Sequence, residues 1–480
     1  MRKIKESKES RNARRKRERE NQPKKESSRF GFFIVVVCAA AIALSFVSVA
    51  RIDPKEPTEP DPIDVTTVNS RALSTSWTCP YMGEAETNNL VIVNPLENRS
   101  ALIRITSHTS EGEQIYSDTI EVGSLSKTVV DLSSYRSDSN FVLFVESFSA
   151  PVAVFRNIEL SDGFEFPPCL PFTSSKAVFP SLTTERLSNS ILYLANPFKE
   201  AVVVDISATL SNGSGETLTV QSDQISGQVI PARGRTIIDL QNPEAFGRFS
   251  DISLTINSRS GFFVSEVLMQ YNGARGATGE TVVLPSRELV SEFRHVVPGV
   301  SPTKIVGANA SNNAGAISVG TFAADARSFL NEPLNFVAGS TLQLSVPGED
   351  FGLRAISFLL ERGGTKNNMY TAWNHISADA VSSGEGALLS TTDKILPMYG
   401  GDTLEFYNAN NKTVEVEIEI FGSNVKKTIE LKPNSYVSQA LVELPESELS
   451  IVRVISGDEI FSASSGPQIN RHNVGITIAK

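Results

Sequence analysis

Length, composition and charge limit the classes to which this protein can belong. The chain has 480 residues and 40% of them are apolar, so it is long enough for several domains and too apolar for a disordered protein. Its net charge is −10, but residues 1–29 hold 13 basic and 5 acidic side chains, which leaves −18 on the remainder. An acidic main body argues against nucleic acid as a partner, because phosphate binding requires a basic surface.

The N-terminal segment predicts a tail followed by a membrane anchor. Residues 1–29 lack an apolar face, and we expect them to be a disordered, basic, cytoplasmic tail. The 20 residues from Gly31 to Ala50 carry no charge, and a helix of this length spans roughly 30 Å of hydrocarbon. We therefore predict a single transmembrane helix at residues 30–50, with the body of the protein outside the cell membrane.

A cleaved signal peptide is the alternative to this anchor. Ser48-Val49-Ala50 offers small residues where cleavage after Ala50 would occur. The apolar run is nevertheless longer than the core of an ordinary signal peptide, and the tail before it is also long.

Residues 51–70 follow as a linker whose first twelve residues contain four Pro and four acidic side chains. This composition predicts a stiff, extended spacer.

The cysteines predict one disulfide. Cys38 lies inside the apolar run, which leaves Cys79 and Cys169 as an even pair in an oxidising compartment. We predict that these two are bonded, and closing a loop of about ninety residues stabilises by about 4 kcal/mol in the chain-entropy model. Two unpaired buried thiols are the alternative. A catalytic cysteine is disfavoured, since no His lies near either one in the sequence.

The main body contains four similar units, each marked by an Asn at the end of an apolar strand. These residues are Asn94, Asn196, Asn309 and Asn408, at intervals of 102, 113 and 99 residues. An alternating segment follows each Asn, such as Val-Glu-Val-Glu-Ile-Glu-Ile at 414–420, and this period of two is typical of a strand with one buried face. Asn adopts left-handed backbone and forms Asx turns, so the strand-end Asn is interpreted as a turn residue rather than a binding feature.

Frequent turns and about seven short strands per hundred residues predict an all-β fold of tandem immunoglobulin-like β-sandwiches. A β-propeller is the alternative, in which the last strand would complete an earlier unit. The predicted sandwiches cover residues 71–178, 179–293, 294–393 and 394–480.

Short motifs carry a resemblance to a known family. They are Trp77 to Pro80, Asn94-Pro95, Asn196-Pro197 and Val145-Glu146-Ser147. With the anchor and linker, these residues resemble a family of uncharacterised actinobacterial proteins that are secreted or membrane-anchored. The resemblance covers most of residues 70–480, although the third and fourth units have Asn-Ala in place of Asn-Pro. It implies a location and a fold, and it supplies no catalytic residue.

The sequence holds few candidates for chemistry. No two of the four His lie at a metal-ligand spacing, no Gly-x-Ser-x-Gly elbow is present, and we expect neither a metal nor a cofactor. Carbohydrate-binding sandwiches use exposed aromatic side chains, which makes Tyr370 and Trp373 candidates for a contact surface, expected to be exposed or half-exposed in a polar insertion of the third unit. His375 beside them is the most suggestive His, and its alternative interpretation is a loop His bonded to backbone.

The sequence therefore favours a non-catalytic scaffold or binding protein of the bacterial cell envelope, held by residues 30–50. Its partner would be a cell-wall glycan or an envelope protein. Two alternatives remain: a hydrolase of wall glycan or peptide, and an envelope sensor that signals through the basic tail.

Overall fold

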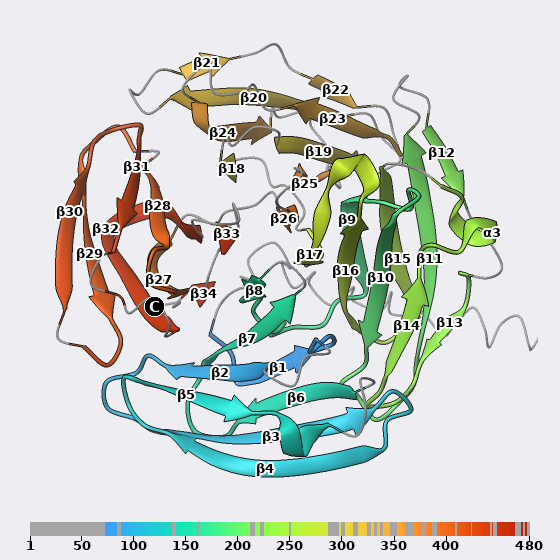
Figure 1. The fold of residues 1–480 in the computed structure, drawn as a ribbon, viewed down its shortest axis with the longest axis horizontal. Coiled ribbons are helices and arrows are strands. Elements are labelled where there is room, and N and C mark those ends of the chain that lie inside the picture. Colours follow the sequence, from blue (N-terminus) through green and yellow to red (C-terminus); the bar gives the residue numbers. More distant parts are fainter. Residues whose placement is uncertain are drawn as a thin grey trace, which may run out of the picture. The chain divides into compact units, whose positions relative to one another are not determined.

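The computed structural model describes most of the main body and none of the first 72 residues (Figure 1). Backbone contacts divide the chain into two units, Met1–Thr67 and Val68–Lys480, and all described residues belong to the second. The predicted tail, the span at 30–50 and the linker at 51–70 lie outside the described residues. Within the described part, no helix has the length and apolarity needed to span a membrane. The described residues are 73–83, 88–136, 141–160, 163–211, 217–220, 225–248, 251–286, 297–298, 303–310, 315–323, 328–330, 334–336, 339–345, 353–360, 369–376, 381–385, 391–408, 410–423, 425–441, 444, 449–465, 472–473 and 476–477.

The first segment forms two antiparallel sheets, one with strand order β1-β6-β3-β4 and the other with order β5-β2-β7-β8. Successive strands cross repeatedly from one sheet to the other, and we call this two-sheet unit the first sandwich. The short 3-10 turn η1 (Ser133–Tyr135) precedes β6. The strands are β1 (Ser76–Cys79), β2 (Asn89–Asn94), β3 (Ala101–Thr109), β4 (Gln114–Val122), β5 (Ser126–Asp131), β6 (Phe141–Ser147), β7 (Ala153–Leu160) and β8 (Gly163–Glu165).

The second segment repeats this organisation. Its sheets have the orders β12-β11-β15-β9, with β13 also paired to β11, and β14-β10-β16-β17. Two short helical turns, α3 (Pro243–Phe246) and η2 (Ala274–Gly276), connect strands of this second sandwich. The strands are β9 (Lys176–Leu182), β10 (Ser188–Ala195), β11 (Val202–Ser211), β12 (Thr217–Val220), β13 (Gln228–Ile230), β14 (Arg235–Asp239), β15 (Ile252–Ser260), β16 (Val264–Asn272) and β17 (Thr278–Val283).

The third segment again forms two sheets, with the orders β18-β24-β20-β21, in which β22 pairs β20, and β23-β19-β25-β26. We call it the third sandwich. Its strands are β18 (Val297–Pro298), β19 (Thr303–Asn309), β20 (Gly315–Ala323), β21 (Ser328–Leu330), β22 (Leu334–Phe336), β23 (Thr341–Ser345), β24 (Leu353–Leu360), β25 (Met369–Ile376) and β26 (Val381–Glu385).

In the fourth sandwich one long strand, β32, belongs to both layers. Its first half pairs with β27 and β29, and its second half pairs with β28, so a single strand replaces the two that a turn separates in the first sandwich. The strands are β27 (Thr391–Met398), β28 (Thr403–Asn408), β29 (Val414–Ile420), β30 (Lys426–Leu431), β31 (Ser435–Ala440), β32 (Ser450–Ser465), β33 (His472–Asn473) and β34 (Ile476–Thr477).

Side-chain alternation explains the layers. In β29 the Val and Ile side chains are buried, while the Glu side chains between them are exposed or half-buried. A strand of this kind can cover a core with one face only, and two such sheets must face each other to exclude water. The buried apolar residues of the first, second and fourth sandwiches accordingly form clusters to which both sheets contribute.

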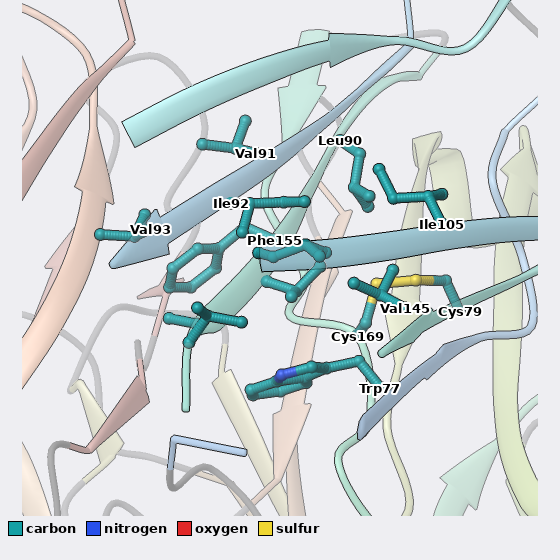
Figure 2. Close-up of a cluster of buried hydrophobic side chains, with 14 of the residues drawn as sticks. Trp77, Cys79, Leu90, Val91, Ile92, Val93, Ile105, Val145, Phe155 and Cys169 are labelled. Carbon is teal, nitrogen blue, oxygen red and sulfur yellow. A yellow bond between two sulfur atoms is a disulfide. The ribbon is translucent and has the colours of Figure 1, made fainter. Parts of the chain in front are cut away.

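The core of the first sandwich contains the predicted disulfide (Figure 2). Cys79 and Cys169 are bonded, which confirms the prediction, and both are fully buried. Trp77 lies in the same cluster, together with Phe155 from the opposite sheet. Its indole N–H donates a hydrogen bond to the Ser74 carbonyl, so this large side chain is buried with its polar atom satisfied.

The structure is all-β, as predicted, and its strand order bears on the propeller alternative. In β1-β6-β3-β4 most neighbours are not consecutive in the chain, whereas a blade built as a meander would pair consecutive strands. Two described strands cross boundaries that were expected between units. β9 spans the boundary expected at 178/179 and pairs with β15, so it belongs to the second sandwich, while β27 spans the boundary expected at 393/394 and belongs to the fourth.

The strand-end Asn connects three segments of backbone in each of three sandwiches. Asn94 is fully buried, and its Oδ1 accepts the N–H of Leu96 at 3.1 Å, which makes the expected turn and confirms that interpretation. Its Nδ2 donates to the carbonyls of Arg99 (2.6 Å), Val122 (3.3 Å) and Gly123 (2.9 Å). One amide therefore holds the end of β2, the loop after it and the turn between β4 and β5. We call this arrangement the asparagine bracket.

The second and fourth sandwiches repeat the asparagine bracket with the same geometry. Asn196 and Asn408 are fully buried, and each accepts the N–H two residues ahead of it. Their Nδ2 atoms donate to the carbonyls of Glu200, Ile230 and Pro231 in the second sandwich, and of Lys412, Leu431 and Lys432 in the fourth.

A left-handed residue lies at the same place after each bracketed turn. Leu125, Arg233 and Asn434 have φ values of 47°, 54° and 49°, and Gly339 occupies the matching place in the third sandwich with φ 65°. The N–H groups of Leu125, Arg233 and Asn434 donate to the carbonyls two residues beyond the bracket Asn. A left-handed backbone costs a residue with a Cβ about 1–2 kcal/mol, so the bracket must offset this strain.

The bracket predicts a large effect of one atom. Replacing Asn94 by Asp exchanges a donor for a buried carboxylate that faces three carbonyl oxygens, and we expect the free energy of unfolding of this sandwich to fall by at least about 3 kcal/mol. Chemical denaturation followed by tryptophan fluorescence measures the change. Asn98→Asp, in the same loop and exposed, is the control and should change little. Equal losses in the two variants would show that the bracket does not hold the turn.

The left-handed position predicts a stabilising substitution. Leu125→Gly removes the strain at a partly exposed side chain and should raise the free energy of unfolding by about 1 kcal/mol. Leu102→Gly, at an equally exposed position in extended β3, should lower it by about 1 kcal/mol. Thermal denaturation of both variants distinguishes them, and a loss of stability in Leu125→Gly would contradict the assignment of strain.

Candidate functional site

The predicted contact residues lie in a buried strand, and the expectation that they are exposed is wrong. Tyr370 and Trp373 belong to β25, and their side chains are 7% and 3% exposed. The segment is a strand inside a sheet, since β25 pairs with β19 on one side and β26 on the other. Residues 370–374 are all buried, polar ones included, so this strand lacks the alternation that marks a half-exposed strand.

The second sandwich covers this strand. The Lys176 ammonium lies 5.3 Å from the centre of the Tyr370 ring, and the Asn374 amide donates to the Ser181 hydroxyl at 2.6 Å. Both partners come from β9, so the surface around β25 serves contact between two sandwiches of this chain. His375 lies in register with Thr303 and Ser382, and a binding role for it remains a prediction.

His108 is the one His whose side chain the structure describes, and its surroundings are not those of a catalytic base. The ring is buried, its Nδ1 lies 3.0 Å from the Gly112 carbonyl, and its edge packs on Phe144. Burial lowers the pKa of His108, the hydrogen bond to Gly112 raises it, and the positive charge of Arg233 lowers it further. Burial outweighs the hydrogen bond to Gly112, so the pKa of this imidazole lies below its usual value. Within the described residues, no three His, Cys, Asp or Glu side chains gather closely enough to hold a metal ion.

A buried charge pair joins the first and second sandwiches. The Arg156 guanidinium on β7 and the Glu266 carboxylate on β16 are 2.7 Å apart, and both side chains are 0% exposed. Arg156 also donates to the carbonyls of Tyr81 (2.5 Å) and Pro168 (3.0 Å), while Glu266 accepts the N–H of Tyr81. We call this group, together with Arg235 below, the arginine junction.

A second arginine contributes from the other side. Arg235 on β14 donates to the Pro80 carbonyl at 2.6 Å, and its guanidinium lies 5.3 Å from the centre of the Tyr193 ring. The Tyr193 ring in turn packs on Tyr81 at a centroid distance of 4.9 Å. The segment after Cys79 is therefore held by charged groups from both sandwiches.

Apolar side chains from both sandwiches surround the arginine junction and exclude water from it. They form one cluster of Tyr81, Val142, Ile158, Leu160, Leu170, Tyr193, Ala195, Val264, Leu268, Val282 and Leu284. At its margin the Glu165 carboxylate accepts hydrogen bonds from the Thr281 hydroxyl at 2.9 Å and the Val282 N–H at 2.8 Å.

A second close contact between the two sandwiches involves Gly112, in the hairpin between β3 and β4. Gly112 adopts φ 91°, and a Cβ there would lie 2.0 Å from the Ala232 carbonyl oxygen, so this position requires glycine.

These contacts determine what the junction can do. A carboxylate that is fully buried and paired with a guanidinium cannot reach a substrate. Removing one partner would leave an uncompensated charge in a medium of low dielectric constant. The arrangement therefore fixes how the two sandwiches dock.

The first sandwich also contacts the fourth. Ile395, Leu449 and Ile451 belong to the core cluster of the first sandwich, and the Lys127 ammonium donates to the Leu449 carbonyl. The Tyr399 ring packs on Phe166 at a centroid distance of 5.1 Å. Described contacts thus link the first sandwich with both the second and the fourth.

A half-buried acid lies beside this contact. Burial raises the pKa of Asp402 and also that of Tyr399. Such a shift is common at catalytic acids, but the Asp402 carboxylate accepts the Tyr399 N–H at 2.7 Å and so closes a turn.

One apolar patch of the first sandwich faces solvent. Leu102 and Phe148 are 44% and 55% exposed, and the Arg104 guanidinium lies 4.9 Å from the centre of the Phe148 ring. Arg104 is also hydrogen-bonded to Glu146. We call these four residues the Phe148 patch. They combine an aromatic face with polar groups at its edge.

Sequence reasoning missed the arginine junction. The available signal was one charge inside each of two apolar strands, Arg156 in Val-Phe-Arg-Asn-Ile and Glu266 in Val-Ser-Glu-Val-Leu. Isolated charges of this kind are rarely buried without a partner. The partner itself could not be inferred, because 110 residues separate the two.

The fold and its junctions define an all-β protein of repeated two-sheet units. No protein-family model and no curated protein matches the chain. Among solved structures, an alpha-L-rhamnosidase of Streptomyces avermitilis in complex with L-rhamnose is similar over 68% of this chain, at 9% identity and a TM-score of 0.13, and this chain spans 46% of that protein's length. A family 32 glycoside hydrolase of Bifidobacterium adolescentis is similar over 84% of this chain and 100% of its own, at 8% identity and a TM-score of 0.14. Scores of this size do not show a shared fold, so neither protein informs the activity of this one.

The arginine junction predicts strong coupling between its two charged residues. Arg156→Met and Glu266→Leu should each lower the free energy of unfolding by about 3–5 kcal/mol, and the double variant should lose much less than the sum, because no unpaired charge remains. Urea denaturation of the three variants measures the coupling.

The exposed pair Arg259 and Asp205 of the second sandwich provides the control for this cycle. Its Ala variants should be close to additive, since water solvates either partner left alone. Additive losses at Arg156 and Glu266 would mean that the pair does not hold the junction.

Proposed function

We propose that this protein is a non-catalytic scaffold or binding protein of the bacterial cell envelope. Residues 30–50 would anchor it by a single pass in the cell membrane, with the N-terminus in the cytoplasm. The body would be displayed outside as tandem immunoglobulin-like sandwiches. The observation that carries this proposal is the arginine junction, because buried charged groups there join sandwiches to one another.

The disulfide supports an extracytoplasmic location. Bonds of this kind persist in oxidising compartments and are rare where thiol buffers keep cysteines reduced. The Cys79–Cys169 bond lies in a core and closes a loop with a sequence separation of 90 residues, as expected for a structural disulfide. The apolar run at 30–50 agrees with export across the same membrane.

The Phe148 patch is our candidate for the partner-binding surface. An exposed aromatic face with a guanidinium and a carboxylate beside it can stack on a sugar ring and bond its hydroxyl groups. The partner would be a cell-wall glycan or an envelope protein. Nucleic acid is disfavoured by the charge of −18 on the main body.

The topology predicts a specific protease pattern. In protoplasts, added protease should digest residues 71–480 and leave the basic tail protected. Without protease, the protein should remain with the membrane fraction. Immunoblotting with antibodies against each end measures this. Release of an undigested body into the medium would show cleavage after Ala50, and protection of the body would contradict the orientation.

Binding to the wall supplies the second test of the proposed function. The full chain in detergent should sediment with purified wall glycan, and Phe148→Ala should reduce the bound fraction at least fivefold. Phe262→Ala, an equally exposed ring in the second sandwich, is the matched control and should not. If neither variant changes sedimentation, the patch is not the glycan site. Conversion of the glycan to smaller products by the wild type would show a hydrolase, and a requirement for the basic tail in an envelope-stress response would show a sensor.

A further inference from the structure

We infer that the Cys79–Cys169 disulfide controls the docking of the second sandwich on the first, so that the junction responds to the oxidation state of this pair. The inference concerns the arginine junction and is independent of the proposed envelope function. It rests on the backbone carbonyls to which the arginines of the junction donate hydrogen bonds.

Those groups directly adjoin the two cysteines. The carbonyl of Pro80, the residue after Cys79, accepts from Arg235 at 2.6 Å, and the carbonyl of Pro168, the residue before Cys169, accepts from Arg156 at 3.0 Å. Arg156 also binds the carbonyl of Tyr81 at 2.5 Å. These three backbone carbonyls, which the two buried arginines bind, thus lie within two residues of the disulfide.

Backbone hydrogen bonds link the segment around Cys79 to the segment around Cys169. Thr78 and Leu170 exchange two backbone hydrogen bonds of 2.8 and 2.9 Å, so the residue before Cys79 is paired with the residue after Cys169. The disulfide holds this short pair together, because it joins Cα atoms 4.7 Å apart. Without it, the segments that carry the acceptor carbonyls separate more easily, and the buried charges lose the partners that compensate their desolvation.

The coupling is reciprocal. Both cysteines are fully buried, and Tyr81 and Leu170 lie in the apolar cluster shared by the two sandwiches. A reductant therefore reaches the disulfide only when the packing around it opens, and the junction holds the neighbouring residues of that packing in place. Because linkage acts equally in both directions, loosening the junction exposes the disulfide and breaking the disulfide loosens the junction.

The chemistry requires a dithiol reductant. Its first thiolate attacks one sulfur of the disulfide, the other cysteine leaves as a thiolate that takes up a proton, and a mixed disulfide forms. The second thiol of the reductant then displaces the remaining cysteine. Two electrons and two protons pass to the protein, which ends with two thiols, and the reductant becomes a disulfide.

The first experiment measures the reduction rate of the full chain by dithiothreitol under native conditions. Glu266→Gln weakens the junction without touching the cysteines, and we expect its disulfide to be reduced at least tenfold faster than that of the wild type. Asp205→Asn removes a charge from the exposed pair of the second sandwich and should leave the rate unchanged. Equal rates for Glu266→Gln and wild type would overturn the proposal.

The second experiment tests the opposite direction by hydrogen exchange with mass spectrometry. In the double variant Cys79→Ala/Cys169→Ala, peptides from β10 and β16 should exchange at least tenfold faster, while peptides from β28 and β31 serve as internal controls and should not change. Unchanged exchange in β16 would overturn the proposal. If the double variant does not fold, the reduction rate of Glu266→Gln decides alone, since that variant keeps the disulfide.

Discussion

The asparagine bracket is the interaction on which the two-layer form of the sandwiches depends. A sandwich has to reverse its chain many times, and the turns it uses here include residues in left-handed backbone, which most residues with a Cβ avoid. The amide of Asn94 supplies what those turns lack, because it bonds both to its own loop and to the turn across the sandwich. Local strain is thereby offset by one buried side chain with all of its bonds made.

The same amide also explains how sequences so different produce similar units. Leu125, Arg233 and Asn434 have little in common as side chains, yet their N–H groups all donate to the residue two beyond the bracket Asn. The position specifies a backbone geometry and leaves the side chain free to vary. In the third sandwich the N–H of Asn309 bonds the carbonyl of Ser340, as that of Asn196 bonds the carbonyl of Gly234.

Sequence reasoning succeeded where the governing contact is local and failed where it is distant. Alternation over 414–420 identified a strand, and an Asn at a strand end identified a turn, because each depends on neighbours in the chain. The disulfide was found by elimination among three cysteines. Tyr370 was misplaced because docking of another sandwich, through Lys176, covers the face of the strand on which its ring lies. Arg156 and Glu266 raise the same difficulty, since a buried charge indicates that a partner exists without indicating where it lies.

The buried charges at the arginine junction make the free energy of docking depend sharply on the relative position of the two sandwiches. An apolar interface alone tolerates small shifts, because its attraction depends on area rather than direction. Arg156 allows no such shift: its donors have to meet Glu266 and the carbonyls of Tyr81 and Pro168 together. An incorrect docking position would leave a buried guanidinium without its partners, at a cost of several kcal/mol. The apolar cluster therefore supplies the attraction between the first two sandwiches, while the charge pair selects the single position in which they can dock. Such a fixed spacing between repeats is what a display scaffold would require.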